Sequence, residues 1–235
     1  MTQFKILLAC IGLVCAFTNC ISQKQSAKSS PSKTVTEVAA YRIETTKDKD
    51  FKLLLNDFRR QVAELEGYND YLTLQDLQHQ NIYIDILHWD NIDLALAASE
   101  EVKNGEKYKP FTTAIDSLIA YGEFYTFKSF THKKVQKMTD KITEVVIYKI
   151  KGNKVQEYAQ IAEAANAFLS KQKGFNSREI LQDHKEENTF MDIVIWDSAE
   201  DAQNAMQASQ KEPSLMPFFQ ATEEIVTFSH YKHFK

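Results

Sequence analysis

Cysteine is missing from most of this 235-residue chain, because all three cysteines, Cys10, Cys15 and Cys20, lie within the first 20 residues. The rest of the chain therefore has no disulfide, and its stability must come from packing. It also has no thiol for nucleophilic attack. Glycine is scarce too, and the six glycines are never clustered, which excludes a glycine-rich phosphate-binding loop.

Metal-binding and nucleic-acid-binding patterns are lacking as well. The six histidines are scattered, and His230 and His233, three apart on an expected strand, point to opposite faces, so we expect no metal site. Four of the 28 basic residues and none of the 32 acidic residues precede residue 35, which leaves 24 basic residues and a net charge of -8. A surface of that sign repels phosphate and argues against a nucleic acid partner.

The first apolar run is too short for a permanent membrane-spanning helix, which needs about 20 residues. It extends from Ile6 to Phe17 after Lys5, so residues 1–20 are predicted to be an export signal. Cys20 resembles the lipidated first residue of bacterial lipoproteins, the alternative being simple cleavage and release. Residues 21–34, rich in Ser, Lys and Gln, are predicted to be a flexible tether. We therefore expect an exported protein of the cell envelope, held at a bacterial membrane through a lipid anchor only.

The body of the chain is a duplicated unit. A gapless shift of 107 positions places Thr36-Glu37-Val38 on Thr143-Glu144-Val145, Trp89-Asp90 on Trp196-Asp197, and Pro110-Phe111 on Pro217-Phe218. Such a period is too long for a solenoid repeat and suits a small domain. We predict two similar domains, residues 35–128 and 142–235, joined by a linker over residues 129–141.

Each copy has the pattern β-α-β-β-α-β by period and composition. Strands are expected at residues 35–44, 68–76, 82–89 and 118–127 in the first copy, and at 142–150, 175–183, 189–196 and 225–234 in the second. Gly67 and Gly174 are expected to end the first helix of each copy in the left-handed conformation. This order predicts an α+β, ferredoxin-like fold with both helices on one face, and with the first and third strands adjacent and parallel.

The other face of each predicted sheet needs a cover. In a duplicated chain the available cover is the sheet of the other copy, which closes a barrel between the two halves. We therefore expect two tandem ferredoxin-like repeats that form an intrachain dimeric α/β barrel, in a monomer that acts as its own dimer.

The third strand and the helix after it resemble a known family. The run from Asp85 to Asn91, followed by Ala95, Ala98 and Pro110-Phe111, is repeated from Asp192 to Ser198, with Ala202, Ala205 and Pro217-Phe218. Both copies resemble the dimeric α/β-barrel superfamily, and most closely its antibiotic biosynthesis monooxygenases. This resemblance implies a cofactor-independent oxygenase as one function.

Haem-degrading members of that superfamily have an Asn on the first strand and a His after the second helix. Those positions hold Tyr41 and Tyr148, and Ile115 and Thr222, in this chain. The resemblance therefore does not extend to a haem site, and we expect no cofactor.

The period of two sorts each strand into two faces. We expect the more apolar set, Ile82, Ile84, Ile86 and His88, to lie under the helices together with Val38 and Ala40. The alternate set would line the barrel interior. It comprises Glu37, Tyr41, Tyr83, Asp85, Leu87 and Trp89 in the first copy, and Glu144, Tyr148, Phe190, Asp192, Val194 and Trp196 in the second.

Four acids and six rings of the alternate set are the candidate site residues. Glu37, Asp85, Glu144 and Asp192 are candidate catalytic bases, because an apolar cavity and a like-charged neighbour both raise the pKa of a carboxyl group towards neutrality. The candidate ligand-binding residues are Tyr41, Tyr83, Trp89, Tyr148, Phe190 and Trp196. The alternative is that the acids are solvated at strand ends, that Trp89 and Trp196 only plug the barrel mouth, and that Tyr41 and Tyr148 merely bond to the acids.

Three functions follow from this set. The first is an envelope-anchored protein that binds a small apolar or aromatic molecule. The second is a cofactor-independent monooxygenase that acts on an aromatic or polyketide-like substrate. The third is a structural or partner-binding envelope protein whose barrel is filled by its own side chains; a cavity of roughly 300 Å³ or more would distinguish the first two from it.

Overall fold

The computed structural model describes residues 33–44, 48–133 and 140–234. The predicted export signal, Cys20 and most of the tether lie outside the described residues, as does the centre of the linker. The described residues all belong to one compact unit. No helix among the described residues combines the length and the apolar character that crossing a bilayer requires.

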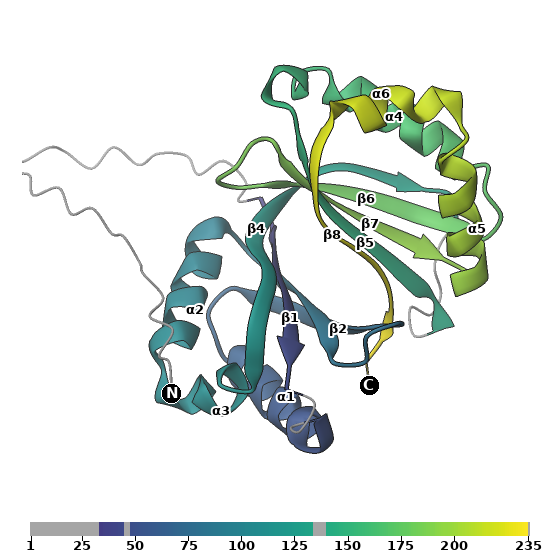
Figure 1. Cartoon of the computed structure of the whole chain (residues 1–235). Coiled ribbons are helices and arrows are strands. Elements are labelled where there is room, and N and C mark those ends of the chain that lie inside the picture. Colours follow the sequence, from purple (N-terminus) through teal and green to yellow (C-terminus); the bar gives the residue numbers. More distant parts are fainter. Residues whose placement is uncertain (1–32, 45–47, 134–139, 235) are drawn as a thin grey trace, which may run out of the picture. The chain divides into compact units, whose positions relative to one another are not determined.

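Both halves of this unit contain the same order of strands and α-helices (Figure 1), and the described residues of the second half form one more 3-10 helix. The first half consists of β1 (Val35–Ile43), α1 (Asp48–Val62), β2 (Tyr68–Asp76), β3 (Ile82–Trp89), α2 (Ile92–Asn104), the 3-10 helix η2 (Glu106–Tyr108), α3 (Lys109–Thr112) and β4 (Ile115–Thr131). The second half consists of β5 (Ile142–Ile150), η4 (Gly152–Lys154), α4 (Tyr158–Leu169), β6 (Phe175–Asp183), β7 (Thr189–Trp196), α5 (Ala199–Ser209), η5 (Pro213–Leu215), α6 (Met216–Ala221) and β8 (Thr222–His233).

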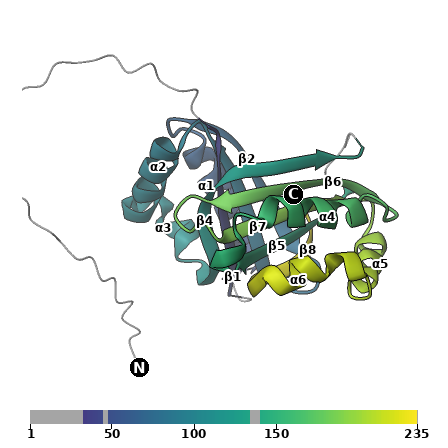
Figure 2. The same ribbon diagram turned by 90° about the horizontal axis from the view of Figure 1, so that it is seen from above.

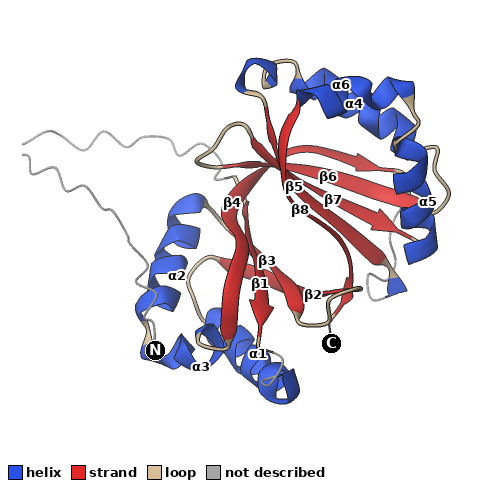
Figure 3. Ribbon diagram, viewed as in Figure 1, coloured by secondary structure: helices blue, strands red, loops and turns tan. Residues whose placement is uncertain are grey.

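The eight strands close into a barrel in the order β1-β3-β2-β8-β5-β7-β6-β4, with the helices of each half on the outside (Figures 2 and 3). Two seams join the halves. β4 pairs with β6 through seven residue pairs, from Phe124↔Asp183 to Thr131↔Ser177, whereas β2 pairs with β8 through three, from Leu74↔His233 to Asp76↔Tyr231. The predicted α+β fold of two tandem ferredoxin-like repeats is confirmed.

Two details of the strands differ from the expectation. β1 and β3 are adjacent but antiparallel, with Val35 opposite Trp89 and Tyr41 opposite Tyr83. The prediction of a parallel pair was wrong, because the crossover through α1 makes β2 parallel to β1 and the hairpin after β2 then reverses β3. β4 is also longer than the predicted 118–127, because its start pairs with β1 and its end crosses to β6 of the other half.

Two glycines fix the position of the strand ends that carry the tryptophans. Gly67 and Gly174 have φ angles of 81° and 77°, which confirms their predicted left-handed conformation, but they do not end the helices, because α1 ends at Val62 and α4 at Leu169. Their carbonyl oxygens accept hydrogen bonds from the backbone N–H groups of Asp90 (2.9 Å) and Asp197 (2.8 Å), the residues that follow Trp89 and Trp196. The turn after the first α-helix of each half is thereby tied to the end of the third strand of that half.

The barrel interior is filled by apolar side chains from both halves. They are Val38, Ala40, Leu74, Ile84, Ile86, Phe124, Val145, Ile147, Leu181, Met191 and Tyr231, and none is more than 5% exposed. A barrel of eight strands is a packed core when its side chains fill it. The two sheets therefore meet as predicted, but not around a cavity that holds the tryptophans.

The predicted assignment of the two faces was wrong, because it is reversed in the structure. Ile84 and Ile86 point into the barrel, while Tyr83, Leu87 and Trp89 pack under the helices with Phe51, Leu55, Phe58, Ala95 and Ala98. The physical reason is that strands surround the barrel interior on all sides. It is therefore more enclosed than the layer under the helices, and it takes the more apolar of the two sets of side chains. The layer between sheet and helices can hold polar groups, because hydroxyl and indole partners lie beside them.

Candidate functional site

A pocket of about 210 Å³ lies between the sheet of the first half and helices α1, α2 and α3. Its apolar wall consists of Ala39, Phe58, Val62, Leu87, Ala98, Val102, Phe111, Ile115 and Leu118. Polar or amphipathic side chains also line it, among them Glu37, Tyr41, Tyr71, Asp85, Trp89 and Tyr121. An apolar cavity with a few convergent polar groups is the usual form of a small-molecule site.

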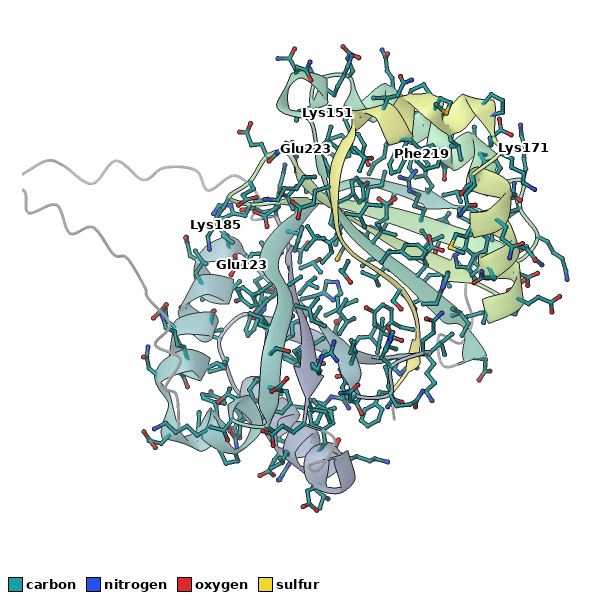
Figure 4. All side chains as sticks on the ribbon, in the orientation of Figure 1. Glu123, Lys151, Lys171, Lys185, Phe219 and Glu223 are labelled. Atoms are coloured by element: carbon teal, nitrogen blue, oxygen red, sulfur yellow. The ribbon has the colours of Figure 1, made fainter. Side chains whose placement is uncertain are left out.

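A second pocket, of about 300 Å³, lies at the equivalent place in the second half. Its lining includes the twins of many first-pocket residues, each 107 positions further on: Glu144, Val146, Ala165, Leu169, Asp192, Trp196, Ala205, Phe218, Ile225 and Phe228. Phe219, 44% exposed, belongs to α6 at this pocket (Figure 4). The duplication has therefore produced two pockets, and both lie outside the barrel.

Seven of the ten candidate residues line these pockets. They are Glu37, Tyr41, Asp85 and Trp89 in the first, and Glu144, Asp192 and Trp196 in the second. The other three lie deeper in the layer between sheet and helices. Tyr83 and Phe190 pack against Phe51 and Tyr158, with ring centroids 4.5 and 4.3 Å apart. The hydroxyl of Tyr148 is 2.8 Å from Asp192 Oδ1.

Asp85 is held at the floor of the first pocket by three neutral donors. It accepts hydrogen bonds from Tyr41 Oη (2.9 Å), Tyr71 Oη (2.5 Å) and Thr73 Oγ1 (2.5 Å), and it is 3% exposed. Burial raises the pKa of this carboxyl from its ordinary 3.8 to about 6, although the three donors oppose the rise.

Glu37 lies nearer the mouth of the same pocket. Its Oε2 accepts from Trp89 Nε1 at 2.8 Å, and its Oε1 accepts from Tyr121 Oη at 3.1 Å. Burial raises the pKa of Glu37 from 4.5 to about 7, and the negative charges of Glu123 and Asp85 add to the rise. A carboxyl group with this pKa can accept and release a proton near neutral pH.

The second pocket keeps the two acids but gives them different partners. Arg178 holds Asp192 through two hydrogen bonds to Oδ2, from Nε at 2.9 Å and from Nη2 at 2.7 Å. The pair is buried, and Arg178 Nη1 also donates to the carbonyl of Ala162 at 3.0 Å. Glu144 Oε2 lies 3.0 Å from Nε2 of His230 on β8. Each acid of this half therefore faces a cationic or protonatable group.

The sequence of the second half matches a known family. Residues 142–224 match the model of the family described as antibiotic biosynthesis monooxygenase. The match covers the second repeat alone, and the first repeat has the same ferredoxin-like order of strands and helices. No curated protein matches the sequence.

Solved structures share the fold of two ferredoxin-like repeats over most of the chain. An anthrone oxidase-like protein is 15% identical, with a TM-score of 0.69, over 86% of this chain and 92% of its own. A candidate monooxygenase from Fusobacterium nucleatum subsp. nucleatum is 13% identical, with a TM-score of 0.60, over 87% of this chain and 94% of its own. A candidate chlorite dismutase is 9% identical, with a TM-score of 0.62, over 87% and 96%. At such identities the likeness establishes the fold and not the reaction.

Several residues around the acids were not predicted from the sequence, among them two pairs that occupy equivalent positions of the repeats. Tyr71 and Arg178 occupy one equivalent position, and so do Glu123 and His230, 107 residues apart in each case. The shift that reveals the duplication also aligns these unlike pairs. Their roles could not be found from the alignment, because they depend on contacts between strands that the fold pairs: β2 with β3 and β1 with β4 in the first half, and β6 with β7 and β5 with β8 in the second.

Metal binding finds no support in the described part of the chain, where no three His, Cys, Asp or Glu side chains are grouped to hold an ion. The haem-ligand position of the first half holds Ile115, which is part of the apolar wall of the first pocket. Tyr41, at the Asn position, is bonded to Asp85. These residues do not fit a haem group held as in the haem-degrading relatives.

Proposed function

We propose that this protein binds small, largely apolar or aromatic molecules in the two pockets between its sheets and helices. The observation that carries the proposal is the presence, at the same place in both halves, of an apolar pocket with a buried tryptophan and two acids. Ligand pockets usually measure about 300–1,000 Å³. The second pocket, at about 300 Å³, meets that range, and the first, at about 210 Å³, suits a smaller molecule.

The structural alternative receives less support. The barrel interior is filled by its own side chains, as that alternative requires, but the filled barrel is not where the candidate residues lie. A purely structural layer between sheet and helices would be expected to leave no free space. Pockets of about 210 and 300 Å³ remain beside Trp89 and Trp196, although the rings themselves are 1% and 0% exposed.

The two tryptophans allow each pocket to be tested alone, because the chain has only two and each lines one pocket. Trp89→Phe leaves a reporter in the second pocket, and Trp196→Phe leaves one in the first. We expect fluorescence changes and thermal shifts with some members of a library of quinones, polyketides and fatty acids. Leu53→Ala, at a 70% exposed position, is the control and should bind as the wild type does. No response in either single-tryptophan variant would end the proposal.

A second candidate function is oxygenation without a cofactor in the first pocket. Glu37, with its pKa near 7, would take the proton of an activated phenol or enol, and the resulting anion would pass electrons to molecular oxygen. A general base contributes roughly 10²–10⁴-fold to a rate. Glu37→Gln should therefore lower turnover by about that factor, and Glu144→Gln in the second half should lower it little. Turnover that survives Glu37→Gln excludes this role.

We also propose that the protein is exported and anchored through Cys20. The support comes from the sequence, because residues 1–32 lie outside the described residues. Cys20→Ser should abolish labelling by radioactive palmitate and move the protein from the membrane fraction to the soluble envelope fraction. A wild-type protein that takes up no label would refute lipid attachment.

A further inference from the structure

We infer that the two pockets have diverged into sites of opposite hydrogen-bonding character. The first offers carboxylate acceptors and suits a ligand with an acidic O–H group, such as a phenol or an enol. The second offers an indole N–H and suits a ligand whose polar group is an acceptor only, such as a ketone or a quinone. This inference rests on the proposed ligand binding and adds the ligand class of each pocket.

In the first pocket both acids are held by neutral groups. Asp85 accepts from two tyrosines and a threonine, and Glu37 accepts from Trp89 and Tyr121. Within the described residues, neither acid forms a salt bridge with a lysine or an arginine. Carboxylates without a cationic partner remain strong acceptors, so a ligand O–H is the complementary group.

In the second pocket two replacements occupy both acids. Arg178, in place of Tyr71, neutralises Asp192, and His230, in place of Glu123, pairs with Glu144. Glu123 itself lies beside Lys185 of the other half, with Nζ and Oε2 3.3 Å apart (Figure 4). Because the acids of the second pocket are already paired, a hydrogen-bond donor on a ligand would gain little affinity from them.

The turn of Glu144 towards His230 leaves the neighbouring indole without an acceptor. Trp89 Nε1 donates to Glu37 at 2.8 Å, whereas no described residue accepts a hydrogen bond from its twin, Trp196 Nε1. Trp196 is fully buried and lines the second pocket beside Glu144. Buried donors in folded proteins almost always have an acceptor, so a ligand oxygen in this pocket would complete the site.

The other lining residues also make the first pocket more polar than the second. Ser99, Lys103, Thr112 and Tyr121 line the first pocket, and Ser99 Oγ lies 2.8 Å from Tyr121 Oη. The equivalent positions of the second pocket hold Met206, Gln210, Phe219 and Phe228. The second pocket is therefore both larger and more apolar, as a neutral ligand with a single acceptor requires.

Two probes with one skeleton test the inference on the full mature chain. 2-Naphthol carries an acidic O–H group, and 2-acetonaphthone carries only a carbonyl acceptor. The protein is labelled with ¹⁵N in its two indole groups, and the signals are assigned with Trp89→Phe and Trp196→Phe. We expect 2-acetonaphthone to shift the Trp196 indole N–H downfield and 2-naphthol to perturb the Trp89 signal. Each probe should favour its own pocket about tenfold, the value of one net hydrogen bond.

A variant tests whether His230 is the reason that the Trp196 indole N–H has no acceptor. His230→Leu removes the imidazole partner of Glu144 and puts no donor in its place, so that Glu144 can accept from Trp196 as Glu37 does from Trp89. We expect the affinity of 2-acetonaphthone for the second pocket to fall about tenfold, while 2-naphthol binds the first pocket unchanged. The wild-type titration does not depend on this variant folding.

The outcomes separate the inference from the function on which it rests. If both probes bind but show the same preference in both pockets, the inference is refuted and ligand binding stands. Each probe is added up to its solubility limit. If neither probe then moves either indole signal, and the ligand library also gives no response, both the inference and the proposed ligand binding are refuted. A Trp196 signal that stays unshifted while 2-acetonaphthone occupies the second pocket also refutes the inference.

Discussion

Replacing Glu37 by Gln should make the protein more stable at pH 8 and change its stability less at pH 5. The pKa of Glu37 is about 7 in the folded chain and 4.5 as the ordinary value for an unfolded chain. Between pH 4.5 and about pH 7, the carboxyl group of Glu37 is therefore protonated in the folded state and ionised in the unfolded state. The stabilising effect of this protonation is fully present below pH 4.5 and is lost as the pH rises through 7.

The size of the effect follows from the shift. A difference of about 2.5 pKa units corresponds to about 3.4 kcal/mol between the two protonation states, at 1.36 kcal/mol for each unit. Between pH 5 and pH 8, the ionisation of Glu37 lowers the free energy of unfolding of the wild type by about 2.5 kcal/mol. Glutamine keeps an amide oxygen that can accept from Trp89 and never ionises, so the variant does not incur this loss.

Urea unfolding followed by tryptophan fluorescence at the two pH values measures the difference. Titrations of the other acids cancel when wild type and variant are compared at each pH. Glu144→Gln is the matched control, because it removes a partner of His230 and should bring no gain in stability at pH 8. If the difference between wild type and Glu37→Gln is the same at both pH values, burial does not control this carboxyl group.

Two further substitutions test the packing around the pockets. Arg178→Met should destabilise the second half by about 3–5 kcal/mol in urea unfolding, because it leaves Asp192 buried without its cation, and a loss below about 1 kcal/mol would contradict the buried pair. Gly174→Ala should cost about 1–3 kcal/mol, because φ is 77° and a Cβ would lie 2.5 Å from Asp201 Oδ2. Gly152→Ala is its control, since a Cβ there meets nothing within 4 Å; equal thermal shifts would count against the strain.

The architecture could be predicted from the sequence because the duplication supplied two samples of each position. The 107-residue shift, the strand periods and the turns at Gly67 and Gly174 were enough to predict two ferredoxin-like repeats and the sharing of one barrel. Local patterns also give strand boundaries well where a hairpin sets them, as at β2 and β3. They do not give the length of β4, because its end is determined by pairing with the other half.

The side of the sheet on which the site lies could not be predicted in the same way. Both faces of β3 are buried, so the period of two separates them without saying which faces the helices. Apolar character predicts the wrong face, because a closed barrel is a more enclosed space than the layer beneath the helices and takes the more apolar side chains. The residues that belong together, Glu37, Tyr41, Asp85 and Trp89, were nevertheless correctly grouped on one face.

The covalent link between the halves removes a restriction that every two-fold symmetric assembly obeys. When two identical subunits associate, any altered side chain appears at both sites at once, because each subunit presents the same surface. In this single polypeptide, histidine can stand at position 230 while glutamate stays at position 123. One folding unit has thus acquired the freedom of a heterodimer, without needing two different chains to find each other.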